Sequence, residues 1–119
     1  NTPDEGPFAG TMRPGTNCAD APVVRGGQAG WLLQQLGNGF TVLHFGPAPA
    51  SSVRSGPIEA KVLSVGTDLV EDAERTLTER YDGQPGTTYL IRPDQHVAAR
   101  WRVFDADKIA AAIQHCLAA

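Results

Sequence analysis

The sequence contains two cysteines, Cys18 and Cys116, the residue type best suited to nucleophilic or redox chemistry. They lie near opposite ends of the chain, and no CxxC pair exists. Neither is spaced from a pair of histidines as a metal site requires. Dithiol oxidoreductases hold their cysteines at the start of a helix, whose N-terminus stabilises a thiolate. We therefore predict two reduced thiols, with Cys116 packed as a small hydrophobic residue on the last helix.

The three histidines, His44, His96 and His115, do not combine into a catalytic or metal site. No spacing places two of them on one face of an element. His44 interrupts an apolar run, so we expect it to hydrogen-bond inside the core, and His115 should lie on an exposed helix face. The best available combination for a catalytic triad is Ser51, His96 and Asp94, but no nucleophile elbow supports it. We predict no catalytic and no metal-binding residue.

Residues 26–30, Gly-Gly-Gln-Ala-Gly, are rich in glycine. A dinucleotide fingerprint follows a long strand and opens a long helix, and the sequence indicates neither neighbour here. We therefore predict no cofactor-binding residue in this chain.

Four charged residues cluster in one stretch: Arg92, Asp94, Arg100 and Arg102. Two interpretations remain open. In the first, Arg92 and Asp94 brace a turn while Arg100 and Arg102 are solvated, and such surface pairs contribute little. In the second, the cluster docks against another protein surface, because arginine forks suit carboxylates at interfaces.

The stretch that positions these residues is predicted to be an antiparallel hairpin followed by a helix. Residues 87–91 are β-branched and aromatic, as in a strand, and Pro93-Asp94-Gln95 is typical of a turn. A second strand alternates Ala98, Arg100 and Arg102 with an apolar face made of Val97, Ala99, Trp101 and Val103. Asp105 then N-caps a helix over residues 106–117, with an apolar stripe of Ile109, Ala112, Ile113, Cys116 and Leu117.

The middle of the chain is predicted from apolar periodicity. Residues 40–45 form a nearly continuous apolar run, typical of a central strand buried on both faces, and residues 58–65 form the next strand. Residues 68–81 are predicted to be a helix, because Asp68 and Glu71 resemble a capping box and apolar residues recur every four positions. Gly83 should supply the positive φ of its C-terminal cap.

The first part of the chain has weaker signals. Residues 1–20 have no period and are predicted to be a linker or an extended arm, on which Phe8 and Met12 could each dock. A short strand starts at Pro22 and is broken by Gly26-Gly27. Residues 31–36 should form one or two helical turns, and Trp31 is expected to be a core anchor rather than part of a binding groove.

The string LIRPDQHVAARW, followed by FDADKIAAAI, resembles the C-terminal end of the flavin-dependent aromatic hydroxylases. That family includes phenol, pentachlorophenol and hydroxyphenylpropionate hydroxylases and related polyketide oxygenases. Its last domain is thioredoxin-like and typically ends with an Arg-Pro-Asp-x-His-Val-Ala-x-Arg motif. The matching positions here are Arg92, Pro93, Asp94, His96, Val97, Ala98 and Arg100, and Trp101 follows the motif directly.

The resemblance implies a thioredoxin-like α/β domain over residues 21–119, with a mixed sheet of four or five strands flanked by helices. The implied parent is a monooxygenase that uses FAD and NAD(P)H and inserts one oxygen atom into an aromatic ring. Its FAD fingerprints would lie upstream, so this chain would be a non-catalytic domain that packs on the flavin and substrate body or helps to form a dimer. The active-site loop of a thioredoxin would fall at Gly46–Ser52, which has no cysteine.

Two alternatives remain: a free-standing binding module with a groove between Trp31 and residues 47–49, and a thiol redox protein, suggested by the fold only. Length and composition limit the number of domains and the class of partner. A chain of 119 residues suits one domain, and the formal charge of −3, with scattered basic residues, gives no support for nucleic-acid binding. No apolar run approaches a membrane span, and no secretory signal is visible, so we expect a cytoplasmic protein.

Overall fold

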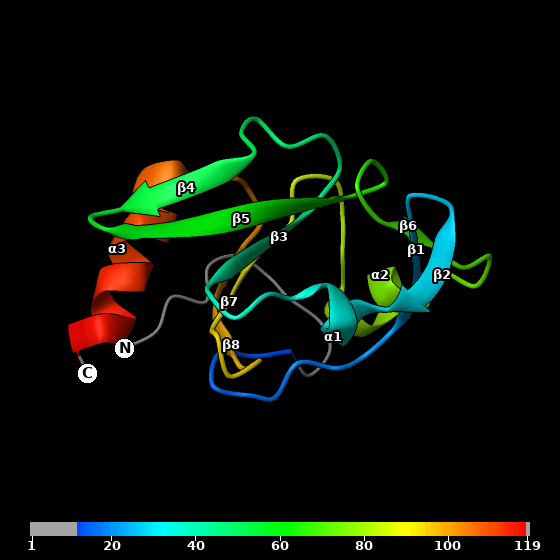
Figure 1. Cartoon of the computed structure of the whole chain (residues 1–119), viewed down its shortest axis with the longest axis horizontal. Coiled ribbons are helices and arrows are strands. Elements are labelled where there is room, and N and C mark those ends of the chain that lie inside the picture. The colour runs from blue at the N-terminus through cyan, green and yellow to red at the C-terminus, as the bar shows by residue number, and fades with distance from the viewer. Residues whose placement is uncertain (1–11, 119) are drawn as a thin grey trace.

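The computed structural model describes residues 12–118, and its main feature is a five-stranded mixed sheet in the order β4-β5-β3-β7-β8 (Figure 1). Its strands are β3 (Thr41–Phe45), β4 (Ser52–Ser55), β5 (Ile58–Val65), β7 (Thr88–Ile91) and β8 (Val97–Trp101). The central strand β3 is buried along its whole length, runs parallel to β5 and is antiparallel to β7. The predicted mixed α/β sheet, its central strand and its C-terminal hairpin are thereby confirmed.

A second, three-stranded sheet has the order β2-β1-β6 and lies at the opposite end of the molecule from the last helix (Figure 1). Its strands are β1 (Pro22–Arg25), β2 (Gln28–Trp31) and β6 (Val70–Glu71). Gly26 and Gly27 join β1 to β2 with φ values of 59° and 80°, which glycine adopts without strain. The pair predicted to break a strand therefore builds a tight hairpin.

Apolar side chains on the two faces of the main sheet form two separate clusters. On one face, α3 (Ala106–Ala118) buries Ile109, Ala112 and Ile113 against strand residues that include Val42, Leu90 and Trp101. On the other face, α1 (Leu32–Gln35), α2 (Thr76–Tyr81) and the small sheet cover Leu43, Phe45 and Tyr89. Covering both faces explains why β3, β7 and β8 are buried at every residue.

The helix predicted over residues 68–81 forms only in its second half, as α2. Leu69 is buried, and Val70–Glu71 becomes β6 because it pairs with β1. The acidic side chains still serve the helix, but from farther upstream. Glu71 accepts a hydrogen bond from the Thr78 amide at 2.6 Å, and Asp72 accepts one from the Thr76 amide at 2.9 Å.

Gly83 does not have the positive φ that we predicted for it. Asp82 adopts that conformation at the end of α2, with φ 47°. Gly83 is instead placed against Phe45, whose ring would collide with a methyl group at this position. The glycine is required here by close approach rather than by backbone conformation.

Two side chains assigned to the core are exposed. Trp31 is 49% exposed at the end of β2, so it is not a core anchor. Leu117, predicted to belong to the buried stripe of α3, is 52% exposed, whereas Ile109, Ala112 and Ile113 are buried as expected. Met12 is buried, and Phe8 lies outside the described residues.

Candidate functional site

The turn of the β7–β8 hairpin is braced by ionic contacts among three residues of the family-like motif. Asp94 forms an ion pair with Arg92 and accepts a hydrogen bond from the His96 amide at 3.3 Å. Gln95 holds the positive φ, 63°, that closes the turn. Partial desolvation tends to raise the pKa of the Asp94 carboxyl, but the hydrogen bond and charge of Arg92 outweigh it and hold that pKa below its usual value. The predicted bracing of the turn is confirmed.

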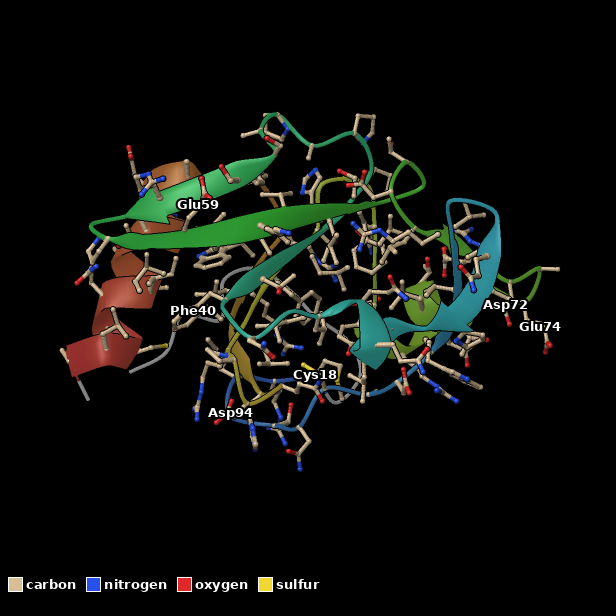
Figure 2. The ribbon with its side chains drawn as sticks, in the orientation of Figure 1. Cys18, Phe40, Glu59, Asp72, Glu74 and Asp94 are labelled. Carbon is tan, nitrogen blue, oxygen red and sulfur yellow. The ribbon has the colours of Figure 1, made fainter. Side chains whose placement is uncertain are left out.

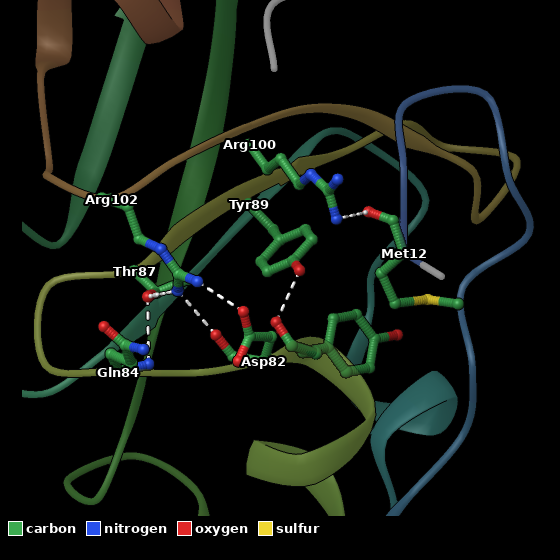
Figure 3. A network of polar contacts seen from close by, with 8 residues as sticks. Met12, Asp82, Gln84, Thr87, Tyr89, Arg100 and Arg102 are labelled. Atoms are coloured by element: carbon green, nitrogen blue, oxygen red, sulfur yellow. Dashed lines mark hydrogen bonds and ion pairs between the residues drawn. The ribbon is translucent and has the colours of Figure 1, made fainter. Parts of the chain in front are cut away.

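Arg100 is buried, which contradicts the first of the two interpretations, in which its side chain is solvated. It is 3% exposed, stands opposite Tyr89 in the hairpin, and donates from Nη1 to the Met12 carbonyl oxygen at 3.0 Å (Figure 3). Alternation along β8 predicted a solvated face because the sequence does not show that residues 12–18 fold back over it. The guanidinium therefore fastens the preceding segment to the sheet.

Arg102, which the first interpretation also makes a solvated side chain, is mostly covered and joins the end of β8 to the end of α2. It forms an ion pair with Asp82 (Figure 3). Its Nη1 also donates to the Asp82 carbonyl oxygen at 2.7 Å and to Thr87 Oγ1 at 2.9 Å. Because Asp82 is the C-cap of α2, one side chain holds the helix end, the start of β7 and the end of β8 together.

The outer edge of β8 is covered by the segment before the first strand. The Gly15 amide donates to the Val97 carbonyl at 2.7 Å, the Val97 amide to the Thr16 carbonyl at 2.8 Å, and the Cys18 amide to the Gln95 carbonyl at 2.9 Å. An exposed edge strand is a template for unwanted pairing, and this segment removes part of it. Over residues 12–20, the segment assigned to a linker or arm thus packs on the domain.

The motif therefore divides into an outer and an inner part. Arg92, Pro93, Asp94 and His96 lie at the exposed or half-buried turn, whereas Arg100 and Trp101 are buried. The turn forms one wall of a surface hollow of about 530 Å³, shared with the end of α3. Its other walls come from Phe40, His115, Cys116 and Leu117. The motif can therefore contact another molecule only through the turn and this hollow.

A second hollow, of about 500 Å³, lies where the parallel strands β3 and β5 end. It is lined by Phe45, Gly46 and Pro47 on one side and by Val70, Gln84 and Pro85 on others. The chain that leaves β3 continues into strand β4, not into a helix. A helix N-terminus that could activate a thiolate does not follow β3. The groove expected between Trp31 and residues 47–49 corresponds only in part, because Trp31 does not line this hollow.

Neither of the two cysteines lines the hollow at that strand end. Cys18, labelled in Figure 2, belongs to the folded-back segment and is buried in the core cluster that includes Met12 and Tyr81, and burial raises its pKa to about 11. Cys116 is half-buried on α3, and desolvation raises its pKa as well. Both are free thiols, as predicted, and both are less readily ionised than an ordinary cysteine.

The histidines and the serine of the weak triad are not brought together. Ser51 precedes β4 and His96 precedes β8, and these strands are the two opposite edges of the main sheet. His44 hydrogen-bonds through Nδ1 to Thr88 Oγ1 at 2.9 Å within the core, and burial lowers its pKa. His115 is exposed on α3, as predicted. Within residues 12–118, no three His, Cys, Asp or Glu side chains are grouped as a metal site requires.

Residues 26–30, the glycine-rich segment, form the β1–β2 hairpin and the start of β2. The nearest helix is α1, a single turn. This geometry does not fit the strand–loop–helix cradle that binds a dinucleotide pyrophosphate. Among the described helices, none has the length and apolar character needed to span a bilayer.

Comparison with known proteins identifies the fold. No protein-family model matches the sequence, and no curated protein matches it either. Aklavinone-11 hydroxylase, solved with FAD and aklavinone, superposes with a TM-score of 0.64 at 21% identity over 84% of this chain and 20% of its own. The flavin-dependent monooxygenase PieE, solved with FAD and substrate, gives 0.67 at 23% identity over 90% of this chain and 21% of its own.

A third similar structure is the reduced 2-Cys peroxiredoxin of Plasmodium vivax, with a TM-score of 0.55 at 16% identity over 92% of this chain and 100% of its own. This likeness confirms the predicted thioredoxin-like fold. The chain spans about a fifth of the length of the two flavin enzymes. The same fold thus occurs both as a small part of flavin-dependent monooxygenases and as a whole peroxiredoxin.

Proposed function

We propose that this chain acts as the non-catalytic C-terminal domain of an aromatic-ring monooxygenase that uses FAD and NAD(P)H. The supporting observation is the match of most of this chain to about a fifth of two flavin-dependent monooxygenases. The Arg-Pro-Asp-x-His-Val-Ala-x-Arg motif at residues 92–100 supports the same assignment. In this proposal the domain packs on the flavin and substrate body or contributes to a dimer.

The sheet end where thioredoxin-like enzymes hold their thiols supports a structural role. The loop after β3 has no cysteine, and the next element is a strand. Both cysteines lie elsewhere, with raised pKa values. A thiol that is protonated at neutral pH is a poor nucleophile, so dithiol exchange is not favoured by this arrangement.

The flavin and the nicotinamide would be held by the remainder of the parent chain. The glycine-rich segment of this chain is a hairpin and does not fit a dinucleotide, so we assign no step of the hydroxylation to its residues. Its contribution would be mechanical. A domain with both sheet faces covered and a braced hairpin turn is a rigid body suited to packing.

The test is to remove residues 21–119 from the complete polypeptide that carries them. We expect the truncated protein to lose thermal stability or change its oligomeric state, with reduced turnover of NAD(P)H and aromatic substrate. Differential scanning calorimetry, sedimentation velocity and steady-state assays measure these effects. Unchanged stability, assembly and turnover would refute the proposal. Reduction of insulin by this chain alone would instead identify a thiol redox protein.

A further inference from the structure

The outer face of the small sheet is apolar at each of its five described positions. Strand pleating places alternate residues on one face, and the registers Pro22↔Trp31, Val24↔Ala29 and Val24↔Val70 put these five side chains together. Trp31 is 49% exposed and Val70 is 51% exposed. We call this set the small-sheet face.

The opposite face of the same sheet already packs on the core. Val23, which alternates with Pro22 and Val24, is buried in the cluster with Leu32, Leu77 and Tyr81. A sheet with one packed face normally presents polar side chains on its other face. Here the polar residues Arg25, Gln28 and Glu71 share the packed side with Val23, and the outer side has apolar residues only. An exposed apolar patch with this organisation marks a contact surface.

Among residues 12–118, the other exposed large hydrophobic residues do not form such a face. Val103 lies in the connection between β8 and α3, and Leu117 lies near the end of α3. Single exposed apolar residues are common on protein surfaces and require no explanation. The small-sheet face differs because its members are neighbours in strand register.

The face is continuous with the hollow at the ends of β3 and β5 through Val70, which belongs to both. The hollow adds Phe45, Pro47, Val65 and Pro85 to the apolar surface, while Asp72 and Arg75 line it as charged residues. An occupant that fits both features presents apolar side chains, at least one of which enters the hollow.

We propose that the small-sheet face docks this domain onto the flavin-binding body of the same polypeptide, an inference that rests on the function proposed above. Area distinguishes this occupant from a second copy. Trp31 and Val70 are 49% and 51% exposed, and one whole aromatic side chain buries about 150–250 Å². Together the five side chains therefore expose roughly 300 Å². A stable dimer buries about 800 Å² on each partner.

A covalently connected partner needs less area. Joining two bodies in one chain gives an effective concentration in the millimolar range, which compensates for a small contact. Domain interfaces within a chain accordingly start at about 600 Å² in total, close to twice the area of this face. The exposed area therefore favours a partner within the same chain.

The experiment places a charge on the face in the complete polypeptide. Trp31→Glu and Val70→Glu each put a carboxylate in the docked surface, and Val103→Glu is the matched control because Val103 is 62% exposed but lies elsewhere. In the 119-residue chain alone, all three variants should keep the wild-type circular dichroism and melting temperature, since the side chains are exposed. The measurement is the rate at which a protease releases the domain from the native polypeptide.

We expect Trp31→Glu and Val70→Glu each to raise the release rate roughly tenfold, and Val103→Glu to leave it unchanged. Equal release rates for all three variants, in a polypeptide that still needs residues 21–119 for stability, would refute docking through the small-sheet face. The accessory role would remain intact. No effect from deleting residues 21–119 would refute the accessory role itself. Conversion of a dimer to monomers by Val70→Glu, with an unchanged release rate, would make the occupant a second copy and overturn the inference.

Discussion

The ring of Phe45, at the end of the central strand, lies directly against the backbone of Gly83, just after α2. A methyl group on Gly83 would overlap ring atoms Cδ2 and Cε2 of Phe45, and even Cζ would lie only 2.7 Å away. Phe45 is buried in the cluster that includes Leu43, Leu77 and Tyr81, so its ring has little room to move. The contact fixes where α2 ends relative to the main sheet.

Gly83→Ala should therefore destabilise the chain. Overpacking a filled core costs about 1–3 kcal/mol, and the urea midpoint should fall accordingly with an unchanged m-value. Gly37→Ala is the control, because a methyl group there meets nothing within 4 Å. A Gly83→Ala variant as stable as Gly37→Ala would contradict the placement of the Phe45 ring.

The link between α2 and the hairpin should contribute more than an ordinary surface pair. Arg102 and Asp82 are mostly covered, and Arg102 also donates to the Asp82 carbonyl and to Thr87. Arg102→Met should cost about 1.5–3 kcal/mol, the range for hydrogen bonds to charged groups. A double-mutant cycle with Asp82→Asn isolates the pair.

The matched comparison is the pair of Arg54 and Glu59, which joins neighbouring strands β4 and β5 with both side chains more than half exposed. Its coupling energy should be below about 1 kcal/mol. If the two cycles give the same coupling, the coverage of Arg102 has no energetic consequence and the expected difference is wrong.

The two arginines at the ends of the family-like motif should respond differently to truncation. Arg100→Met removes a buried donor to the Met12 carbonyl and should cost about 1.5–3 kcal/mol, whereas Arg92→Ala should cost less than about 1 kcal/mol because its pair with Asp94 is exposed. Amide exchange at Gly15 and Cys18 should also accelerate in Arg100→Met only. Slow exchange at both amides in that variant would show that Arg100 does not hold the segment.

Much of the main sheet could be predicted from the sequence because its signals are local. The apolar run at residues 40–45, the strand at 58–65 and the turn at 93–95 coincide with β3, β5 and the tip of the β7–β8 hairpin. Asp105 caps α3 as predicted, with its Oδ1 accepting the Lys108 amide at 3.1 Å. Each of these elements depends on residues a few positions apart.

The wrong predictions concern residues whose long-range contacts override the local sequence pattern. Acidic residues before α2 resembled a capping box, but β1 offers Val70–Glu71 a strand partner, so the helix starts later. Alternation along β8 indicated a solvated Arg100, but residues 12–18 return to cover it. Only one missed feature had a readable signal: Gly26-Gly27 between two short strands is a strong hairpin sequence.

The surface contact of the hairpin motif could be located only in part. The motif marked residues 92–101 as one unit, yet the structure exposes its turn and buries Arg100 and Trp101. The small-sheet face had no sequence signal of comparable strength. Its five residues come from three short strands, and their neighbourhood exists only once β1, β2 and β6 have paired.

The buried thiol of Cys18 should make the stability of the chain depend on alkaline pH. Its folded-state pKa is about 11, above the ordinary 9.0, because burial disfavours the thiolate. The unfolded chain therefore loses this proton first, and stability falls as the pH rises from about 9 towards 11. The loss attributable to Cys18 should reach about 2 kcal/mol at pH 10.5, out of a total of about 2.7 kcal/mol for a pKa raised from 9.0 to about 11, and it should be absent in Cys18→Ala.

Urea unfolding at pH 8 and pH 10.5 measures this loss as a difference between the wild type and Cys18→Ala, which cancels the titration of other groups. Cys116→Ala serves as the control, because Cys116 is only half-buried and its variant should retain most of the alkaline loss. Alkylation with iodoacetamide at pH 8 should correspondingly modify Cys116 before Cys18. Faster modification of Cys18, or equal alkaline losses in the wild type and Cys18→Ala, would mean that the segment carrying this thiol opens readily and does not seal that part of the core.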